Sequence, residues 1–273
     1  MPRYSENDPL INTKIRQAVA GAIYVEIAIT AGMKWEGVDI SKPDEEKRKQ
    51  NPDQKREGDY SGKFKRIRDD GNVPALSSCK YIQKSLKGGN IVKWRSHPIW
   101  PLLCNHLTNA EYINKALKTI ESRVRLSIWD IPYDLGDKKF SPRSEISPVA
   151  IKDVSEFRNF DALLTLTAWA KESRNGNILK SSWQCAEHLY NIFPQAICNT
   201  PHLFIRWPLL IEIYNESIWS QLESEVSYKW VKVDLSLLAQ EIKKEEILAR
   251  KRGIKLPPPH IVSSINKNHY LFH

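Results

Sequence analysis

The stretch AVAGAIYVEIAITAGM, residues 18–33, is apolar on nearly every side, and Glu26 is its only charged residue. A helix that is apolar all round is normally buried centrally in a fold or in an oligomer. Capping residues before Pro9 and a glycine at Gly37 predict one long helix over Leu10–Trp35. Its apolar part falls short of the roughly 20 residues that cross a bilayer. We therefore expect a buried helix and no membrane partner.

The composition predicts a folded protein. The chain has 273 residues, is 41% hydrophobic and contains nine Trp, which supply large buried areas. A polar, acid-containing start without an apolar run predicts a protein that is not secreted, and that is cytoplasmic, or nuclear in a eukaryote. Its scattered cysteines then indicate free thiols rather than a disulfide scaffold. They are Cys79, Cys104, Cys185 and Cys198.

Composition shifts divide the chain in two. Residues 41–70 mix both charge signs and contain almost no apolar residues, which predicts a linker or a long solvated loop. A proline-rich passage before Pro148 is the best candidate boundary. We expect an N-terminal basic α+β region, 1–148, and a helical C-terminal region, 149–273, with an extended tail from 254. The predicted fold class is mainly α with a minor β component.

In the N-terminal region, Ser77 or Ser78 predicts the start of a short helix that a glycine pair ends. A strand over 90–95 follows it, and a hairpin across 87–90 is the alternative. Thr108 with a glutamate three residues later predicts a helix over 108–126. A second strand is predicted over 125–131.

In the C-terminal region, apolar spacing and capping residues predict four helices. The first begins with the capping-box pattern of Asp153 and Glu156. The second ends near Pro194. The third begins near Pro201 and is interrupted or restarted at Pro208, and the fourth spans Asp234 or Ser236 to Gly253.

Positive charge is concentrated between residues 63 and 125. Residues 71–128 hold nine Lys or Arg and two Asp or Glu, which accounts for +7 of the formal net charge of +9, and 71–110 lacks acids entirely. A polyanion docking there would gain free energy through counterion release. The candidate nucleic-acid-binding residues are Lys63, Lys65, Arg66, Arg68, Lys80, Lys84, Lys87, Lys93, Arg95, Lys115, Lys118 and Arg123.

Two details shape this interpretation. On a helix Lys80, Lys84 and Lys87 share one face, and in a strand Lys93 and Arg95 would share another. The alternative is that these cations are neutralised by acids from elsewhere in the fold. Among the aromatic residues of the block, we expect Trp100 in the core and leave Tyr81 and Trp94 open between burial and base stacking.

Two further constellations are candidates for chemistry. Cys185, His188, Cys198 and His202 have donor types that suit zinc if they converge, although a buried helix explains the first two as well. A carboxylate-rich stretch followed by lysine is a candidate metal-dependent nuclease site, although its spacing is also typical of a turn. Its residues are Asp130, Asp134, Asp137 and Lys139.

The sequence favours a non-catalytic nucleic-acid-binding protein, DNA or RNA, within a nucleoprotein complex. No Walker loop, dinucleotide fingerprint or G-x-S-x-G elbow is present, so no cofactor is expected. The alternative is a structural or scaffold subunit that contacts other proteins through its Trp-rich helices and the terminal HYLFH, residues 269–273. A metal-dependent nuclease is the third hypothesis.

Overall fold

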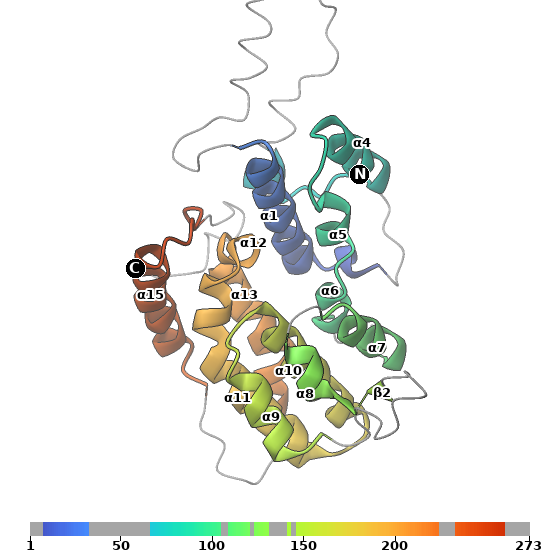
Figure 1. Ribbon diagram of the computed structural model, residues 1–273, viewed down its shortest axis with the longest axis vertical. Coiled ribbons are helices and arrows are strands. Elements are labelled where there is room, and N and C mark those ends of the chain that lie inside the picture. The colour runs from blue at the N-terminus through green and yellow to red at the C-terminus, as the bar shows by residue number, and fades with distance from the viewer. Residues whose placement is uncertain are drawn as a thin grey trace, which may run out of the picture. The chain divides into compact units, whose positions relative to one another are not determined.

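The computed structural model is mainly helical (Figure 1) and describes residues 8–32, 66–104, 109–120, 123–130, 141–142, 146–223 and 233–259. The chain forms two compact units that interleave in sequence. Unit 1 comprises Met1–His97, Pro201–Leu210 and Ala249–His273, and unit 2 comprises Pro98–Thr200 and Ile211–Leu248. Compact units need not be independently folding domains, so the predicted division at 148 stays a prediction.

Unit 1 is organised around α1, Thr13–Thr30, which confirms the predicted buried helix. Its first free amide groups are capped by Asn12, whose Oδ1 accepts from the N–H groups of Lys14 and Ile15 at 2.9 and 3.2 Å. Asp8 caps the preceding 3-10 turn η1, Pro9–Ile11. The side chains of α1 are buried from residue 17 through residue 28, so α1 forms the core of this unit.

Two short helices of unit 1 pack against α1, namely α5, Ile91–Arg95, and α12, Pro201–Phe204. Gly21 of α1 lets the Arg206 side chain, which follows α12, lie close to the α1 backbone. A Cβ built at Gly21 would be only 2.6 Å from Cγ of Arg206. Arg206 is almost fully buried, and burial lowers its pKa to about 10. Its guanidinium donates a hydrogen bond to the carbonyl oxygen of Arg68.

The predicted helix after Ser77 or Ser78 exists as α4, Leu76–Ser85, although Ala75 occupies the N-cap position. The predicted strand over 90–95 is wrong, because these residues form α5, and the alternative hairpin is wrong for the same reason. Helical spacing places Ile91 in the core and keeps Lys93 exposed. The N-terminal α+β region is therefore not confirmed.

Unit 2 is built on the helix pair α10, Phe160–Asn175, and α11, Leu179–Cys198 (Figure 1). Four further helices pack around this pair or against one another. They are α6, Ile99–Leu102; α7, Ala110–Lys118; α8, Val124–Ile128; and α9, Pro148–Ser155. Trp100, at 1% exposure, lies in the core as predicted.

Several predicted boundaries in unit 2 are wrong. Ser147 caps α9 and Asn159 caps α10, so the Asp153 and Glu156 pattern begins no helix. The helix expected to end near Pro194 continues to Cys198. The buried neighbours Phe193, Ala196 and Ile197 stabilise this last turn by packing, which offsets the hydrogen bond that proline cannot donate.

The β structure of the described residues is one two-residue ladder, β1 Trp129–Asp130 with β2 Ser141–Pro142. Most of the strand predicted over 125–131 is helix α8 instead. The helix predicted over 108–126 is divided, since α7 ends at Lys118 and is capped by Asn109. The predicted cap Thr108 lies outside the described residues.

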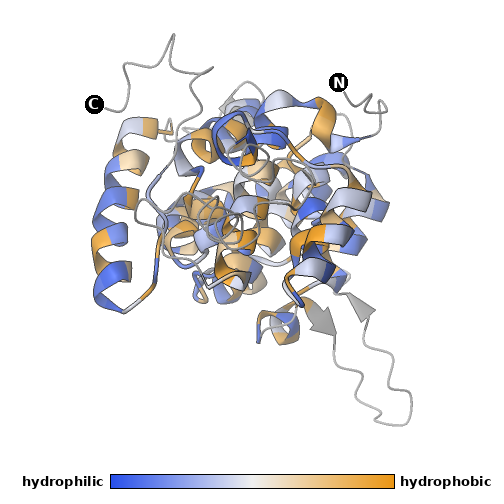
Figure 2. Cartoon of the chain, turned by 90° about the horizontal axis from the view of Figure 1, so that it is seen from above, coloured by the Kyte–Doolittle hydropathy of each residue, from blue (hydrophilic) through white to orange (hydrophobic). Residues whose placement is uncertain are grey.

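The last helices follow the proline and capping signals. The third predicted helix is divided into α12 and α13, Trp207–Tyr214, and Pro208 lies in the first turn of α13. The chain then continues as the π-helix η2, Asn215–Trp219, and as α14, Ser220–Glu223. The fourth is α15, Leu235–Lys251, where Asp234 Oδ1 accepts from Leu237 N–H at 2.9 Å. Figure 2 shows hydrophobic and hydrophilic residues interleaved along the helices. Within the described residues, none of the helices is both long enough and apolar enough to cross a membrane.

Lys171 is a buried cation in the core of unit 2. Its Nζ donates to the carbonyl oxygen of Ser217 in η2 at 2.5 Å, and burial lowers its pKa to about 7. The folded state therefore binds fewer protons than the unfolded state between pH 7 and the ordinary lysine value of 10.5. Across that range the lysine makes the free energy of unfolding rise with pH, and its burial is most costly below pH 7.

Replacing Lys171 with Met should remove this pH-dependent cost. We compare the free energy of unfolding of Lys171→Met with that of the native protein, measured by chemical denaturation. The difference, variant minus native, should be more positive near pH 6 than near pH 9.5. Lys243→Met, at an exposed position of α15, is the control and should show no such pH dependence. An equal difference between Lys171→Met and the native protein at both pH values would contradict the assignment.

Candidate nucleic-acid interface

Three exposed lysines of unit 1 lie on and just after α4. Lys80 and Lys84 lie one turn apart on the solvent side of α4, while Cys79 and Ile82 face the core. Lys87 follows the helix end with φ 55°, so the helix does not continue to it, and it too is exposed. We call these three lysines the α4 cationic surface. No carboxylate of the described residues forms an ion pair with any of them.

The predicted pairing of Lys93 with Arg95 on one face is wrong. Successive residues of a helix are rotated by about 100°, so the two side chains of α5 point in different directions. Lys93 is exposed, whereas Arg95 is half-buried and its Nε donates to the carbonyl oxygen of Pro74 at 3.1 Å. Arg95 therefore anchors the segment that enters α4.

The cations that precede α4 differ in their surroundings. Residues 66–69 form one helical turn in which Arg66 is exposed. Arg68 pairs with Asp69, Nε to Oδ1 at 2.5 Å, and lies over the Tyr24 ring at 6.0 Å. The hydrogen bond that Arg68 donates to Asp69 raises the pKa of Arg68 above its ordinary value. Its charge is thus largely matched by Asp69, and the other two candidates, Lys63 and Lys65, lie outside the described residues.

The remaining candidate cations belong to unit 2. Lys115 and Lys118 are exposed on α7, and Arg123 is exposed just before α8. The basic block that is continuous in sequence is therefore divided between the two units. Within unit 1, the α4 cationic surface is the part of this block that lies on α4 and just after its last residue.

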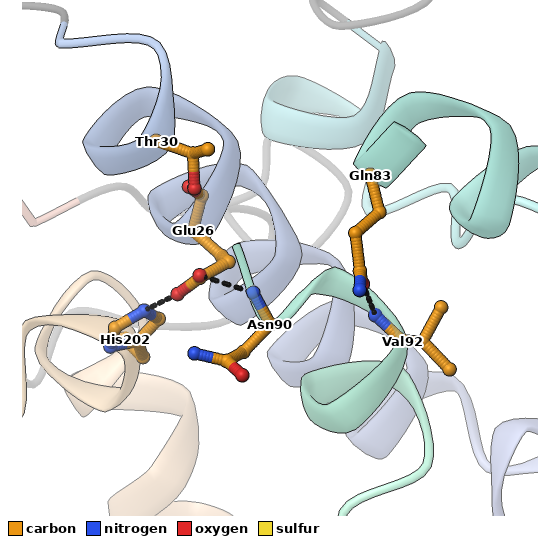
Figure 3. Close-up of polar contacts among 6 residues, drawn as sticks. All are labelled: Glu26, Thr30, Gln83, Asn90, Val92 and His202. Carbon is orange, nitrogen blue, oxygen red and sulfur yellow. Dashed lines mark hydrogen bonds and ion pairs between the residues drawn. The ribbon is translucent and has the colours of Figure 1, made fainter. Parts of the chain in front are cut away.

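The first amides of α5 are capped by side chains of other helices (Figure 3). Asn90 occupies the N-cap position of α5, but its own side chain makes no capping hydrogen bond. Instead, Oε1 of Glu26 in α1 accepts from the Asn90 N–H at 2.5 Å, and Oε1 of Gln83 in α4 accepts from the Val92 N–H at 3.1 Å. A carboxylate at this end also complements the helix dipole. These two bonds hold α1, α4 and α5 in one arrangement.

Glu26 also binds α12. Its Oε2 lies 2.6 Å from Nε2 of His202, and Thr30 donates to the carbonyl oxygen of Glu26 at 2.8 Å (Figure 3). The bond to His202 is the largest cause that lowers the pKa of Glu26, assisted by the amide of Asn90 and opposed by burial. The carboxylate is only 6% exposed, so these partners replace the water it has lost.

The ring of Trp94 is stacked between two imidazoles. Its centroid lies 4.3 Å from that of His202 and 5.4 Å from that of His97, with interplanar angles of 15° and 26°. Burial lowers the pKa of His97 to about 4, so this imidazole is neutral at pH 7. Trp94 therefore contributes to the packing of unit 1.

Gly89 completes the turn between α4 and α5. Its φ is +88°, and a Cβ built there would lie 2.4 Å from Oγ1 of Thr30. Both facts restrict this position to glycine. The glycine pair that predicted a helix end thus also lets the chain approach α1 closely enough for Glu26 to reach Asn90.

Sequence reasoning missed the Glu26 cluster. The available signal was a lone carboxylate in an apolar helix, since a buried charge requires a partner. The partner His202 lies 176 residues further along the chain, so the spacing of residues in the sequence could not predict this pairing. Of the four zinc candidates, His202 is therefore the one that pairs with Glu26.

The other zinc candidates have structural partners in unit 2. Cys185 is buried, which raises its thiol pKa, and Nδ1 of His188 lies 3.0 Å from Oγ of Ser155. Sγ of Cys198 donates to the carbonyl oxygen of Ile242 at 3.6 Å. In the part of the chain that the structure describes, no three His, Cys, Asp or Glu side chains form a group that could hold a metal ion.

The candidate nuclease residues are almost entirely outside the described residues. Only the backbone of Asp130 is placed, in β1 opposite Ser141. Asp134, Asp137 and Lys139 fall in the segment 131–140, which is not described. The nuclease hypothesis stays a prediction.

Comparisons with protein-family models, curated proteins and solved structures find no match for this chain. The chemistry of the site therefore rests on its own residues. Exposed ammonium groups on a fixed helix can bind anions through charge and hydrogen bonds.

Replacing Glu26 with Gln should destabilise unit 1, because the amide cannot match the charge-assisted bonds to His202 and Asn90. We expect a loss of about 1–3 kcal/mol in the free energy of unfolding at pH 7, measured by chemical denaturation. Because the folded pKa of Glu26 lies below its ordinary value of 4.5, its contribution is present above pH 4.5 and is lost as the pH falls through the folded value.

The control is Glu187→Gln, at an exposed position of α11. It should change stability little at any pH. A Glu26→Gln variant as stable as the native protein at pH 7, or one whose deficit persists unchanged at low pH, would show that the carboxylate does not stabilise the fold in this way.

Proposed function

We propose that the protein is a non-catalytic nucleic-acid-binding protein that contacts the phosphate backbone through the α4 cationic surface. The supporting observation is that Lys80, Lys84 and Lys87 are exposed together without a described carboxylate to neutralise them. Such a group of ammonium ions attracts a polyanion and releases its counterions on binding. Nucleic acid is the polyanion that this chemistry fits best.

The neighbouring residues support the same role. Lys93 on α5 and Arg66 on the preceding helical turn are exposed in the same unit and add positive charge. The Glu26 and Gln83 caps fix α5 relative to α4, so the backbone positions that carry the lysines of the two helices keep a constant spacing. Fixed backbone positions reduce the conformational freedom that would be lost on binding a phosphate backbone.

A structural subunit of a larger assembly is the second candidate. Apolar side chains of α15 favour it, since Leu237, Ile247 and Leu248 are 46%, 57% and 48% exposed. Such residues are typical of protein contact surfaces when they gather on one helix. Both roles are compatible with a nucleoprotein complex. Salt separates them, because backbone binding weakens steeply with salt and an apolar contact does not.

We expect a triple variant to lose most of the affinity for nucleic acid. It combines Lys80→Gln, Lys84→Gln and Lys87→Gln. Removing three phosphate contacts should also weaken the salt dependence. The negative slope of log K against log salt concentration should become less steep by about 2 to 3. Both quantities are measured by fluorescence anisotropy with labelled DNA and RNA across a salt series.

The matched control is Lys180→Gln, Lys243→Gln, Lys255→Gln, which removes the same charge from exposed positions elsewhere. It should keep nearly native affinity if the α4 cationic surface is the site. Equal losses in both triple variants would indicate a general effect of net charge and would contradict the proposed site. Absence of binding by the native protein would reject the function itself.

A further inference from the structure

Resting on the proposed function, we infer that the α4 cationic surface binds single-stranded nucleic acid and that Tyr81 stacks on an unpaired base. Tyr81 is 55% exposed and lies on α4 between Lys80 and Lys84 in sequence. A single exposed aromatic residue is ordinary by itself. Its position within the cationic face is what points to a base.

Helix geometry places the ring among the cations. Lys80 and Lys84 are four residues apart, which corresponds to roughly 6 Å along the helix axis. Tyr81 and Lys84 are three residues apart and are therefore neighbours on the helix surface. A strand whose phosphates contact the two lysines would bring its bases next to the phenol ring.

Two other aromatic residues of the basic block are engaged in packing. Trp94 is stacked between His97 and His202, and Trp100 is 1% exposed. Tyr81 is 55% exposed and lies next to lysines on α4. Stacking on such a ring is sequence-tolerant because every base has a π-face.

A duplex would not use this feature. Its base faces are covered by stacking, so only phosphates and groove edges are accessible along its length. The α4 face therefore matches a single strand better than a duplex.

The test compares Tyr81→Ala, Tyr81→Phe and the triple lysine variant on single strands and duplexes of roughly 16 nucleotides or base pairs. The probes are oligo(dT), oligo(U) and a mixed-sequence DNA duplex. Tyr81→Ala should weaken binding to the single strands by about 5- to 150-fold, which is the loss of one stacked base, and leave duplex binding within about twofold. Tyr81→Phe keeps the ring and should stay within about twofold of native affinity on every probe.

The outcomes separate the inference from the function on which it rests. If the triple lysine variant loses binding while Tyr81→Ala does not, the proposed function stands and the stacking inference is wrong. An equal loss on single strands and duplex would also overturn it. The thermal unfolding midpoint of each variant is measured alongside its affinity, so that a loss of binding caused by misfolding is recognised.

Discussion

The carboxylate of Glu26 is the constraint on which the arrangement of unit 1 depends. It lies in the middle of a buried apolar helix, where an unpartnered charge would be strongly destabilising. Its two oxygens bind the amide of Asn90 and the imidazole of His202, at 2.5 and 2.6 Å. One side chain therefore joins three segments that are far apart in sequence. The glycine at position 89 is required for the same contact, since any side chain there would meet Thr30.

This constraint connects the core to the surface. Helix α5 is only five residues long and has no cap of its own, so its formation depends on Glu26 and Gln83. Through Gln83 the same network reaches α4, whose exposed side carries Lys80 and Lys84. A buried polar cluster thus fixes the helices whose exposed face we propose as the binding surface. Loss of the cluster should affect binding indirectly, through the order of α4 and α5.

Local signals predicted much of the helical structure. The buried helix α1, the short helix α4 and the last helix α15 were all predicted from apolar spacing and capping residues, and the interruption at Pro208 was predicted from proline chemistry. Predictions failed where tertiary contacts decide. The residues of α5 have strand propensity but are capped by other helices, and Pro194 is retained within α11 because its neighbours are buried. The lysines of α4 were predicted from charge alone, whereas the pairing of Glu26 with His202 required the fold.

The most direct measurement of the central claim is amide hydrogen exchange of the native protein with and without a single-stranded oligonucleotide. It maps the contact along the chain without any substitution. The account predicts slower exchange over residues 76–95, which contain α4 and α5, and unchanged exchange in the α10 and α11 pair. Protection confined to unit 2, or no protection at saturating oligonucleotide, would contradict it.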